Sequence, residues 1–372
     1  MEKVVKRAIK LYFNIFFALL FGNCYLLKTL MKIFKKEIKI SIIIKYSAII
    51  EIIFYLIMLI TLYTIPSFFN LLFYGLFLLI AYYINLFFSS LIYYIVNFLG
   101  IKLNKYTNLF LFIGIGTLIT SIGMINENRL LYEKVQIKCN NLKGSIKIAH
   151  LSDLHLGAIY GKKFVQKIVD YIKEENKIDF IVITGDLEDG NIKMTSEMLE
   201  PFSQLNIPKY YVTGNHESFC SLNEVFKTIN NSSITHLYNE NIIFDNKINI
   251  IGIDYDSNYD LIKNKLKSLI PKNNYPNIFI HHIPIFEAKE LSEYNIFLFL
   301  CGHTHGGQLF PMNILHYFVS KVYKGLYNYN NSNYIYVASG VDTSGSPIRT
   351  MSKTLIGIIN LEGNMSFIFK EF

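Results

Sequence analysis

A long uncharged stretch near the N-terminus restricts this chain to few possible folds. Residues from Ile52 to Ile101 include no Asp, Glu, Lys or Arg. One membrane-crossing helix needs about 20 apolar residues, so the stretch has room for two. Pro66 and its polar neighbours are the main interruption, and they predict a short turn between two spans. A buried helix bundle in a soluble protein is disfavoured, because such a core rarely needs so many consecutive uncharged residues.

The sequence predicts a transmembrane region over residues 1–126, with three or four helices. The expected spans cover residues 47–65, 71–98 and 107–125, and a weaker candidate covers residues 11–27. A cleaved signal peptide is disfavoured, because apolar sequence continues far beyond one short segment. We therefore expect an integral, multi-pass protein of the cell membrane.

Lysines in short loops predict the orientation of these spans. A cluster of five lies between the first two candidates and a pair lies between the last two: Lys28, Lys32, Lys35, Lys36, Lys39, Lys102 and Lys105. Basic loops favour the cytoplasmic side, so the last span would run outward and place the C-terminal part on the extracytoplasmic side. The basic residues before residue 11 fit this orientation only if residues 11–27 lie in the membrane interface instead of crossing it.

The net charge of +8 is compatible with two kinds of partner. Basic surfaces bind nucleic acid, but lysines also flank membrane spans. The C-terminal part has no basic run interleaved with base-stacking aromatic residues, so nucleic acid is not expected as a primary partner. The four cysteines occur singly, which argues against a zinc ribbon or a disulfide scaffold.

Residues 127–144 are predicted to be a polar linker, and residues 145–372 a globular domain. Apolar runs alternate with amphipathic stretches in that domain, which is typical of a layered α/β fold. The predicted strands cover residues 146–151, 179–184, 210–213, 234–238, 242–245, 248–253, 278–281, 296–300 and 334–338. The predicted helices cover residues 162–174, 193–205, 258–269 and 285–292.

Metal-binding residue types follow directly after five of these strands. The candidate ligands are Asp153, His155, Asp186, Asn215, one of His281 and His282, His303 and His305. Ligands in open α/β sheets gather beyond the carboxyl ends of the strands, so the five clusters can converge on one site. A single catalytic zinc uses about three protein ligands, so a set this large suits two divalent ions. Its mixture of imidazole, carboxylate and amide groups suits Mn, Fe or Zn, and Asp186 is the natural bridging carboxylate.

Other polar residues have more ordinary explanations. Isolated histidines are expected to be structural, and these are His150, His236 and His316. Glu188 and Asp189 are interpreted as solvated loop charges. Arg349 could contact a phosphate or pair with a carboxylate, and the sequence favours neither. Without the other clusters, Asp153 would be read as a helix cap.

In order, the motifs Asp-x-His, Gly-Asp, Gly-Asn-His-Glu, His-x-Pro and Gly-His-Thr-His resemble those of the calcineurin-like metallophosphoesterase superfamily. The longer Gly302–Gln308 motif, the N-terminal spans and the later Ser346–Arg349 segment are similar to its membrane-associated bacterial branch. The resemblance covers about residues 146–360. It implies a β-sandwich flanked by helices. It also implies a metal-dependent phosphoric ester hydrolase, in which a metal-bound hydroxide attacks a phosphomonoester or phosphodiester.

The resemblance also implies roles for individual residues. One metal would be held by Asp153, His155, Asp186 and His305, and the other by Asp186, Asn215, His282 and His303. His282 is preferred to His281 because it keeps the His-x-Pro spacing. His216 would not bind metal but would stabilise transition-state charge or protonate the leaving oxygen.

The substrate class stays open at this point. A lipid or cell-envelope phosphate is one expectation, because the domain is tethered near a membrane, and a soluble nucleotide or small phosphoester is the other. A membrane-bound sensor or scaffold that keeps the metal site without turnover is an alternative function. The presence of His216 argues against that alternative, because a site that only binds metal does not need it.

Overall fold

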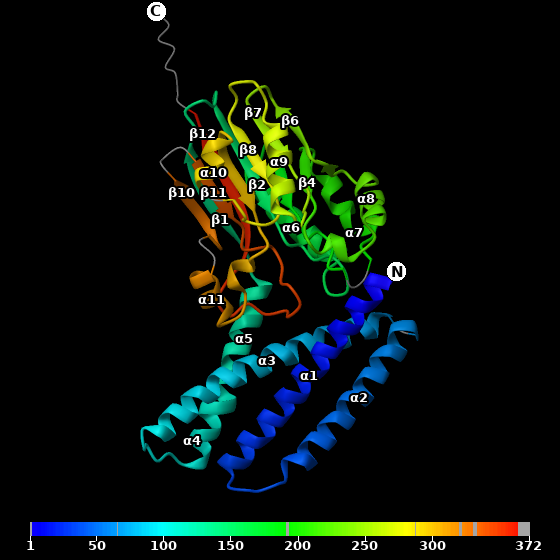
Figure 1. Ribbon diagram of the computed structural model, residues 1–372, viewed down its shortest axis with the longest axis vertical. Coiled ribbons are helices and arrows are strands. Elements are labelled where there is room, and N and C mark those ends of the chain that lie inside the picture. Colours follow the sequence, from blue (N-terminus) through cyan, green and yellow to red (C-terminus); the bar gives the residue numbers. More distant parts are fainter. Residues whose placement is uncertain are drawn as a thin grey trace, which may run out of the picture. The chain divides into compact units, whose positions relative to one another are not determined.

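The protein is described by a computed structural model over residues 2–64, 66–190, 193–286, 288–319, 322–329 and 333–363 (Figure 1). Its chain forms two compact units. The helical unit comprises Met1–Glu127 together with Gly345–Thr350, and the sheet unit comprises Asn128–Ser344 together with Met351–Phe372. Six residues from near the C-terminus therefore belong to the helical unit.

The helical unit consists of long apolar helices. They are α1 (Glu2–Ile33), α2 (Ile40–Thr64), α3 (Pro66–Phe98), and the continuous run of α4 (Lys105–Leu109), η1 (Phe110–Gly114) and α5 (Ile115–Asn128). Four stretches are long and apolar enough to cross a membrane, namely Asn14–Ile33, Ile40–Ile57, Leu71–Phe98 and Lys105–Asn128. The second begins earlier than expected, because the helix continues through Lys45, whose side chain is exposed.

A polar network joins three of these helices. Asn23 of α1 donates its Nδ2 hydrogen to Oε1 of Glu51 in α2, at 2.7 Å. Tyr83 of α3 donates its hydroxyl hydrogen to Oδ1 of the same asparagine. Polar side chains inside apolar helices are costly unless they find such partners, so the network fixes how α1, α2 and α3 pack together.

Residues 345–350 are held in the helical unit by hydrogen bonds to backbone carbonyl groups. The Arg349 N–H donates to the Gly123 carbonyl at 2.9 Å, and Nδ2 of Asn126 donates to the Arg349 carbonyl at 3.1 Å. Ser346 donates its hydroxyl hydrogen to the Phe77 carbonyl at 3.0 Å. The Arg349 side chain is fully buried, which favours a structural role over contact with a phosphate.

The sheet unit contains two six-stranded mixed sheets. The first has the order β1 (Leu130–Lys138), β12 (Thr354–Glu362), β2 (Ser145–Leu151), β3 (Phe180–Thr184), β4 (Lys209–Val212), β5 (Thr235–His236). The second has the order β10 (Gly325–Tyr329), β11 (Asn333–Val337), β9 (Ile296–Cys301), β8 (Asn277–Ile280), β7 (Ile248–Gly252), β6 (Glu240–Phe244).

The central strands of each sheet run parallel. Strands β2, β3, β4 and β5 pair in parallel in the first sheet, as do β7, β8, β9 and β11 in the second. Antiparallel partners flank them, because β12 pairs with β2, β6 with β7, and β10 with β11. Within each sheet, the carboxyl ends of the parallel strands therefore lie at one edge.

Alternating side chains of the strands build the layers. Phe180 and Val182 of β3 enter the core between the two sheets, whereas Ile181 and Ile183 face α6 (Lys162–Glu174) on the outer side. On the other outer side, Phe279 of β8 packs with α9 (Tyr259–Leu269). The predicted β-sandwich flanked by helices is thus confirmed.

Several elements differ from the sequence prediction. The segment expected to be a linker contains β1, which pairs along its whole length with β12. The charged residues of β1 conceal its strand pattern in the sequence. The helix expected at 193–205 is reduced to α7 (Ser196–Leu199) and the 3-10 turn η2 (Glu200–Gln204), with Pro201 near the start of that turn. Four further elements were not predicted: β10, β12, α8 (Leu222–Asn230) and α11 (Met312–Val319). The helix predicted at 285–292 is α10 (Ala288–Glu293), which begins and ends later.

Candidate metal centre

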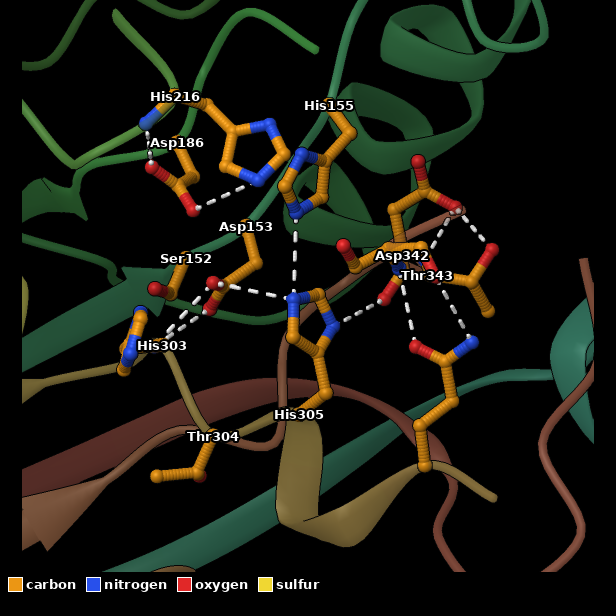
Figure 2. A network of polar contacts seen from close by, with 12 residues as sticks. Ser152, Asp153, His155, Asp186, His216, His303, Thr304, His305, Asp342 and Thr343 are labelled. Carbon is orange, nitrogen blue, oxygen red and sulfur yellow. Dashed lines mark hydrogen bonds and ion pairs between the residues drawn. The ribbon is translucent and has the colours of Figure 1, made fainter. Parts of the chain in front are cut away.

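The predicted ligands follow strands whose carboxyl ends lie at one edge of the sandwich. Asp153 and His155 follow β2, Asp186 follows β3, and Asn215 follows β4 in the first sheet. In the second sheet, His282 follows β8, and His303 and His305 follow β9. Figure 2 shows side chains from both sheets converging. The parallel pairing of the strands is what brings these distant parts of the sequence together.

The backbone at these positions adopts an uncommon conformation. Five candidate ligands have positive φ angles, between 44° and 73°: Asp153, His155, Asp186, His303 and His305. This left-handed region is costly for residues other than glycine, and such residues concentrate at functional sites.

A glycine permits the close approach of two of these loops. A Cβ atom on Gly302 would lie 1.8 Å from Oγ of Ser152 and 2.6 Å from Oδ2 of Asp153. Only a residue without a side chain fits there. The His303 N–H then donates to the Asp153 carboxylate at 3.2 Å, so the two loops are locked together.

One group of candidate ligands contains Asp153, His155 and His305. One ligand atom from each lies within 4.8 Å of the others. Nε2 of His305 is 3.2 Å from Nε2 of His155 and 3.4 Å from Oδ1 of Asp153 (Figure 2). All three side chains are buried. Convergence of imidazole nitrogens and a carboxylate oxygen in a buried place fits a divalent cation.

A second group is centred on His282. Its Nε2 lies 3.2 Å from Oδ2 of Asp186, 3.1 Å from Oδ1 of Asn215 and 3.1 Å from Nδ1 of His303. A single ring N–H cannot donate to three acceptors in different directions, whereas one cation could be shared by all four atoms. Asp186 also forms a third group with His216 and with His155, which is a member of the first group.

The structure separates the two adjacent histidines. Nδ1 of His282 lies 2.8 Å from the Thr184 carbonyl, which leaves Nε2 directed at the ligand group. His281 instead has its Nδ1 2.9 Å from the Ile253 carbonyl, and it belongs to none of the three ligand groups. The geometry therefore favours His282 as the candidate ligand.

Protonation of these histidines depends on burial and on their charged neighbours. Burial, followed by the charge of His216, holds the pKa of His155 well below its ordinary value. Burial likewise lowers the pKa of His303 to about 4. Burial also acts to lower the pKa of His282, but Asp186 outweighs it and raises that pKa to about 9. A neutral ring is the form that binds metal, so a cation would displace the proton of His282.

His216 is oriented by Asp189, which was predicted to be a solvated loop charge. Its Nδ1 lies 2.8 Å from the carbonyl oxygen of Asp189, so the ring donates there and its Nε2 lies 3.9 Å from Oδ2 of Asp186. Glu188 is buried and accepts a hydrogen bond from the Met194 N–H at 3.0 Å. Neither residue is a solvated loop charge, because Glu188 is buried and the Asp189 side chain is only 12% exposed. The His216 side chain keeps 19% of its surface exposed, so a substrate can reach it.

Glu217 is a functional residue that sequence reasoning missed. Its fully buried carboxylate accepts hydrogen bonds from the N–H groups of Leu187 at 2.6 Å, Glu188 at 3.1 Å and Gly214 at 2.7 Å. It also accepts one from the Asp186 N–H at 3.2 Å. One side chain thus holds two loops that carry candidate ligands. Its position directly after Asn215 and His216 was the available signal.

The loop that carries His305 is braced from a later segment. Nδ1 of His305 lies 3.3 Å from the Asp342 carbonyl, which directs Nε2 toward Asp153 (Figure 2). Gln308 donates from Nε2 to the Ser344 carbonyl at 3.3 Å and accepts from the Ser344 N–H at 2.9 Å. These contacts explain the extension of the motif beyond its two histidines.

Comparison with known proteins finds relatives with the same motifs. A family model described as calcineurin-like phosphoesterase matches residues 146–307. An uncharacterised metallophosphoesterase of Aquifex aeolicus (strain VF5) is 31% identical over 262 residues, which cover 67% of this chain and 98% of that protein. An uncharacterised metallophosphoesterase of Helicobacter pylori (strain J99) is 30% identical over 62% of this chain and 63% of its own length.

One relative, from an animal, is named as a transmembrane protein. A transmembrane protein with metallophosphoesterase domain from Bos taurus is 28% identical over 265 residues, which cover 64% of this chain and 59% of that protein. The match therefore spans less than two thirds of the Helicobacter and Bos relatives.

Proposed function

The chain belongs to the calcineurin-like metallophosphoesterase family, and we propose that it is a membrane-anchored phosphoester hydrolase that works with two divalent ions. That it is a metal-dependent phosphoesterase follows from the family. The observation that supports two ions is the position of Asp186, which is grouped with His282 and His303 and also with His155, a proposed ligand of the other ion. Mn, Fe and Zn suit the ligand set, since it combines imidazole, carboxylate and amide groups.

Each proposed ion has its own ligands. Asp153, His155, Asp186 and His305 would hold one, and Asp186, Asn215, His282 and His303 the other. When bound, such ions supply Lewis acidity toward the phosphoryl oxygens and lower the pKa of the attacking water. The buried carboxylates also require a counter-charge, because an isolated ionised carboxylate in an apolar interior is costly.

The protein's own residues supply orientation and proton transfer. His216 is fixed by the Asp189 carbonyl, and this leaves its Nε2 free to interact with a phosphate oxygen or with the leaving oxygen. In its neutral form, Nε2 is the acceptor, and in its cationic form it can donate a proton to that oxygen. Glu217 holds the Asp186 and Gly214 loops in register, so that the ligands are preorganised.

The helices imply an anchored enzyme whose reaction takes place beside a bilayer. Among the residues that the structure describes, four stretches have the length and composition of membrane spans. The lysine-bearing segments between α1 and α2 and between α3 and α4 favour the cytoplasmic side, so the sheet unit would lie on the extracytoplasmic side. In a variant whose four native cysteines are replaced by serine, single cysteines introduced at Lys36 and at Ser268 and labelled by a membrane-impermeant maleimide in intact cells test this orientation. Labelling at the lysine segment alone would contradict it.

The proposed activity is tested with the whole chain in detergent. Protein stripped with a chelator and reloaded with Mn²⁺ should release p-nitrophenol from p-nitrophenyl phosphate or from bis-p-nitrophenyl phosphate. Bound metal, measured by elemental mass spectrometry, should approach about two ions per chain. Folded protein without activity on either ester, with Mn²⁺, Fe²⁺ or Zn²⁺, would contradict the proposal.

A further inference from the structure

Helix α11 exposes its apolar side chains. Of the eight residues in Met312–Val319, five large apolar ones are exposed: Met312, Ile314, Leu315, Tyr317 and Phe318. Tyr317 and Phe318 have 70% and 78% of their surface accessible. In a water-soluble domain, a surface helix normally turns its apolar stripe toward the core. Here the outward face is the apolar one.

The polar residues of α11 face the protein. Asn313 packs against the backbone of Gly307, where an added Cβ atom would come within 2.4 Å of the Asn313 Cα. Its Oδ1 atom is shielded from solvent. The ring of His316 stacks on Tyr323 with centroids 6.3 Å apart and an interplanar angle of 10°. The inverted orientation is therefore fixed by specific contacts, and it suits a helix whose outer face meets an apolar medium.

The same helix is braced on the loop that carries two candidate metal ligands. Gly307, directly after that loop, has a φ of 71° and touches the first turn of α11. Beyond the last turn, the Thr304 hydroxyl donates to the Tyr323 carbonyl. Because Thr304 lies between His303 and His305, both ends of α11 are connected to the metal centre within a few residues.

The tether of the sheet unit determines which apolar medium is available. Helix α5 ends at Asn128 and strand β1 begins at Leu130, so one residue separates a membrane-span candidate from the first strand. A domain attached so closely stays beside the bilayer surface. Aromatic residues such as Tyr317 and Phe318 suit the interfacial layer, and an apolar helix face can enter it by about 5–10 Å.

We propose that α11 inserts into the lipid bilayer and that the adjoining metal centre therefore acts on an amphiphilic, phospholipid-like phosphoester. This inference rests on the proposed phosphoesterase activity. In the reaction, water adds its oxygen to phosphorus, the P–O bond to the leaving group breaks, and the leaving oxygen receives a proton. The acyl chains would stay in the bilayer while the headgroup reaches the ligand-bearing loop next to α11.

Fluorescence tests the insertion without requiring turnover. The chain has no tryptophan, so Phe318→Trp introduces a single reporter on α11. The matched control is Ile243→Trp, because Ile243 is 50% exposed and pairs with Asn249 at the beginning of β7, the edge opposite to the metal centre. In vesicles containing phospholipids with brominated acyl chains, Phe318→Trp emission should be blue-shifted and quenched about twofold, whereas the control should be unchanged.

Two fluorescence results would overturn the insertion. One is equal, unquenched emission from Phe318→Trp and Ile243→Trp. The other is a blue shift that brominated lipid does not quench and that grows with protein concentration, which would assign the face to a second copy of the chain. Retained hydrolysis of p-nitrophenyl phosphate by Phe318→Trp verifies that the variant is folded.

Kinetics test the substrate class. A Tyr317→Asp/Phe318→Asp variant should hydrolyse phosphatidic acid or phosphatidylglycerol in vesicles at least about tenfold more slowly than the unmodified chain, with p-nitrophenyl phosphate hydrolysis unchanged. Ile243→Asp should leave both rates unaltered. If protein that cleaves p-nitrophenyl phosphate cleaves neither lipid, the lipid substrate is refuted. If it cleaves no ester at all while Phe318→Trp is still quenched, the proposed function fails and the insertion stands.

Discussion

The Nε2 atoms of His155 and His305 face each other at 3.2 Å, although the two residues are 150 positions apart in the sequence. Their rings stack with an interplanar angle of 21°. Two neutral imidazoles can share one hydrogen at this distance, but Oδ1 of Asp153 lies 3.4 Å from the same His305 nitrogen and adds a third electron-rich atom. This concentration of lone pairs is stable only around a positive charge, which is the physical basis of the proposed metal site.

Loss of individual ligands should remove specific ions. We expect His305→Ala and His303→Ala each to retain about one ion per chain, because each removes a ligand from a different group. Asp186→Asn should weaken both, since Asp186 is grouped with His282 and His303 and also with His155, a proposed ligand of the other ion. Elemental mass spectrometry after dialysis measures the content. Full metal content in both histidine variants would contradict the assignment.

Removal of His216 should abolish turnover and leave the metal in place. His216→Ala is expected to lower kcat for p-nitrophenyl phosphate by about 10²- to 10⁴-fold, since an acid–base or charge-stabilising group is lost. The metal content should equal that of the unmodified chain, because His216 is not a proposed ligand. Unaltered turnover would contradict this role of His216, whereas unchanged function in cells that carry an inactive His216→Ala variant would favour the alternative of a metal-binding sensor or scaffold.

Glu217→Ala should destabilise the sheet unit. The substitution leaves four buried N–H groups without an acceptor, and it should cost about 3 kcal/mol or more of unfolding free energy. Thermal unfolding followed by circular dichroism in detergent measures the loss, and metal affinity should fall as the two loops loosen. The control is Glu197→Ala, whose side chain is 76% exposed and should tolerate replacement. Similar midpoints for the two variants would refute the role of Glu217.

His150 should make the fold sensitive to acid. Burial lowers its pKa from 6.5 to about 3, and its Nε2 lies 2.8 Å from Oγ1 of Thr184. The unfolded chain therefore binds a proton more readily, so stability is complete above pH 6.5 and is lost as pH falls toward 3. The loss should reach about 5 kcal/mol at pH 3.

Thermal midpoints between pH 7 and pH 4 measure this sensitivity. His150→Gln keeps a neutral hydrogen-bonding group but cannot titrate, so its midpoint should fall less steeply with decreasing pH. Equal slopes for the variant and the unmodified chain would exclude His150 as the cause.

Local patterns predicted the centre of the sheet unit well. The uninterrupted apolar run Phe180–Ile183 belongs to a fully buried strand. Candidate ligands follow within three residues of the ends of β2, β3, β4, β8 and β9. Family resemblance then indicated which of those residues share a site. The ligand geometry depends on parallel pairing, because it places the residues that follow the strands at the same edge of the sheet.

Features created by tertiary contacts were not predictable in this way. Strand β1 carries Glu133 and Lys134 and is stabilised by its pairing with β12, far away in sequence. The roles of Glu217 and Asp189 depend on backbone groups from neighbouring loops, which no sequence periodicity encodes. The complete burial of the Arg349 side chain was likewise not predictable from its local sequence.

The membership of Gly345–Thr350 in the helical unit has a consequence for biosynthesis. The membrane helices emerge from the ribosome first, but their unit stays incomplete until almost the whole chain has been translated. When the sheet unit folds, residues 345–350 must stay accessible so that Arg349 can form its hydrogen bonds with Gly123 and Asn126. Maturation of the anchor is therefore a late event that depends on the enzyme domain, and no single cut in the chain yields both units intact.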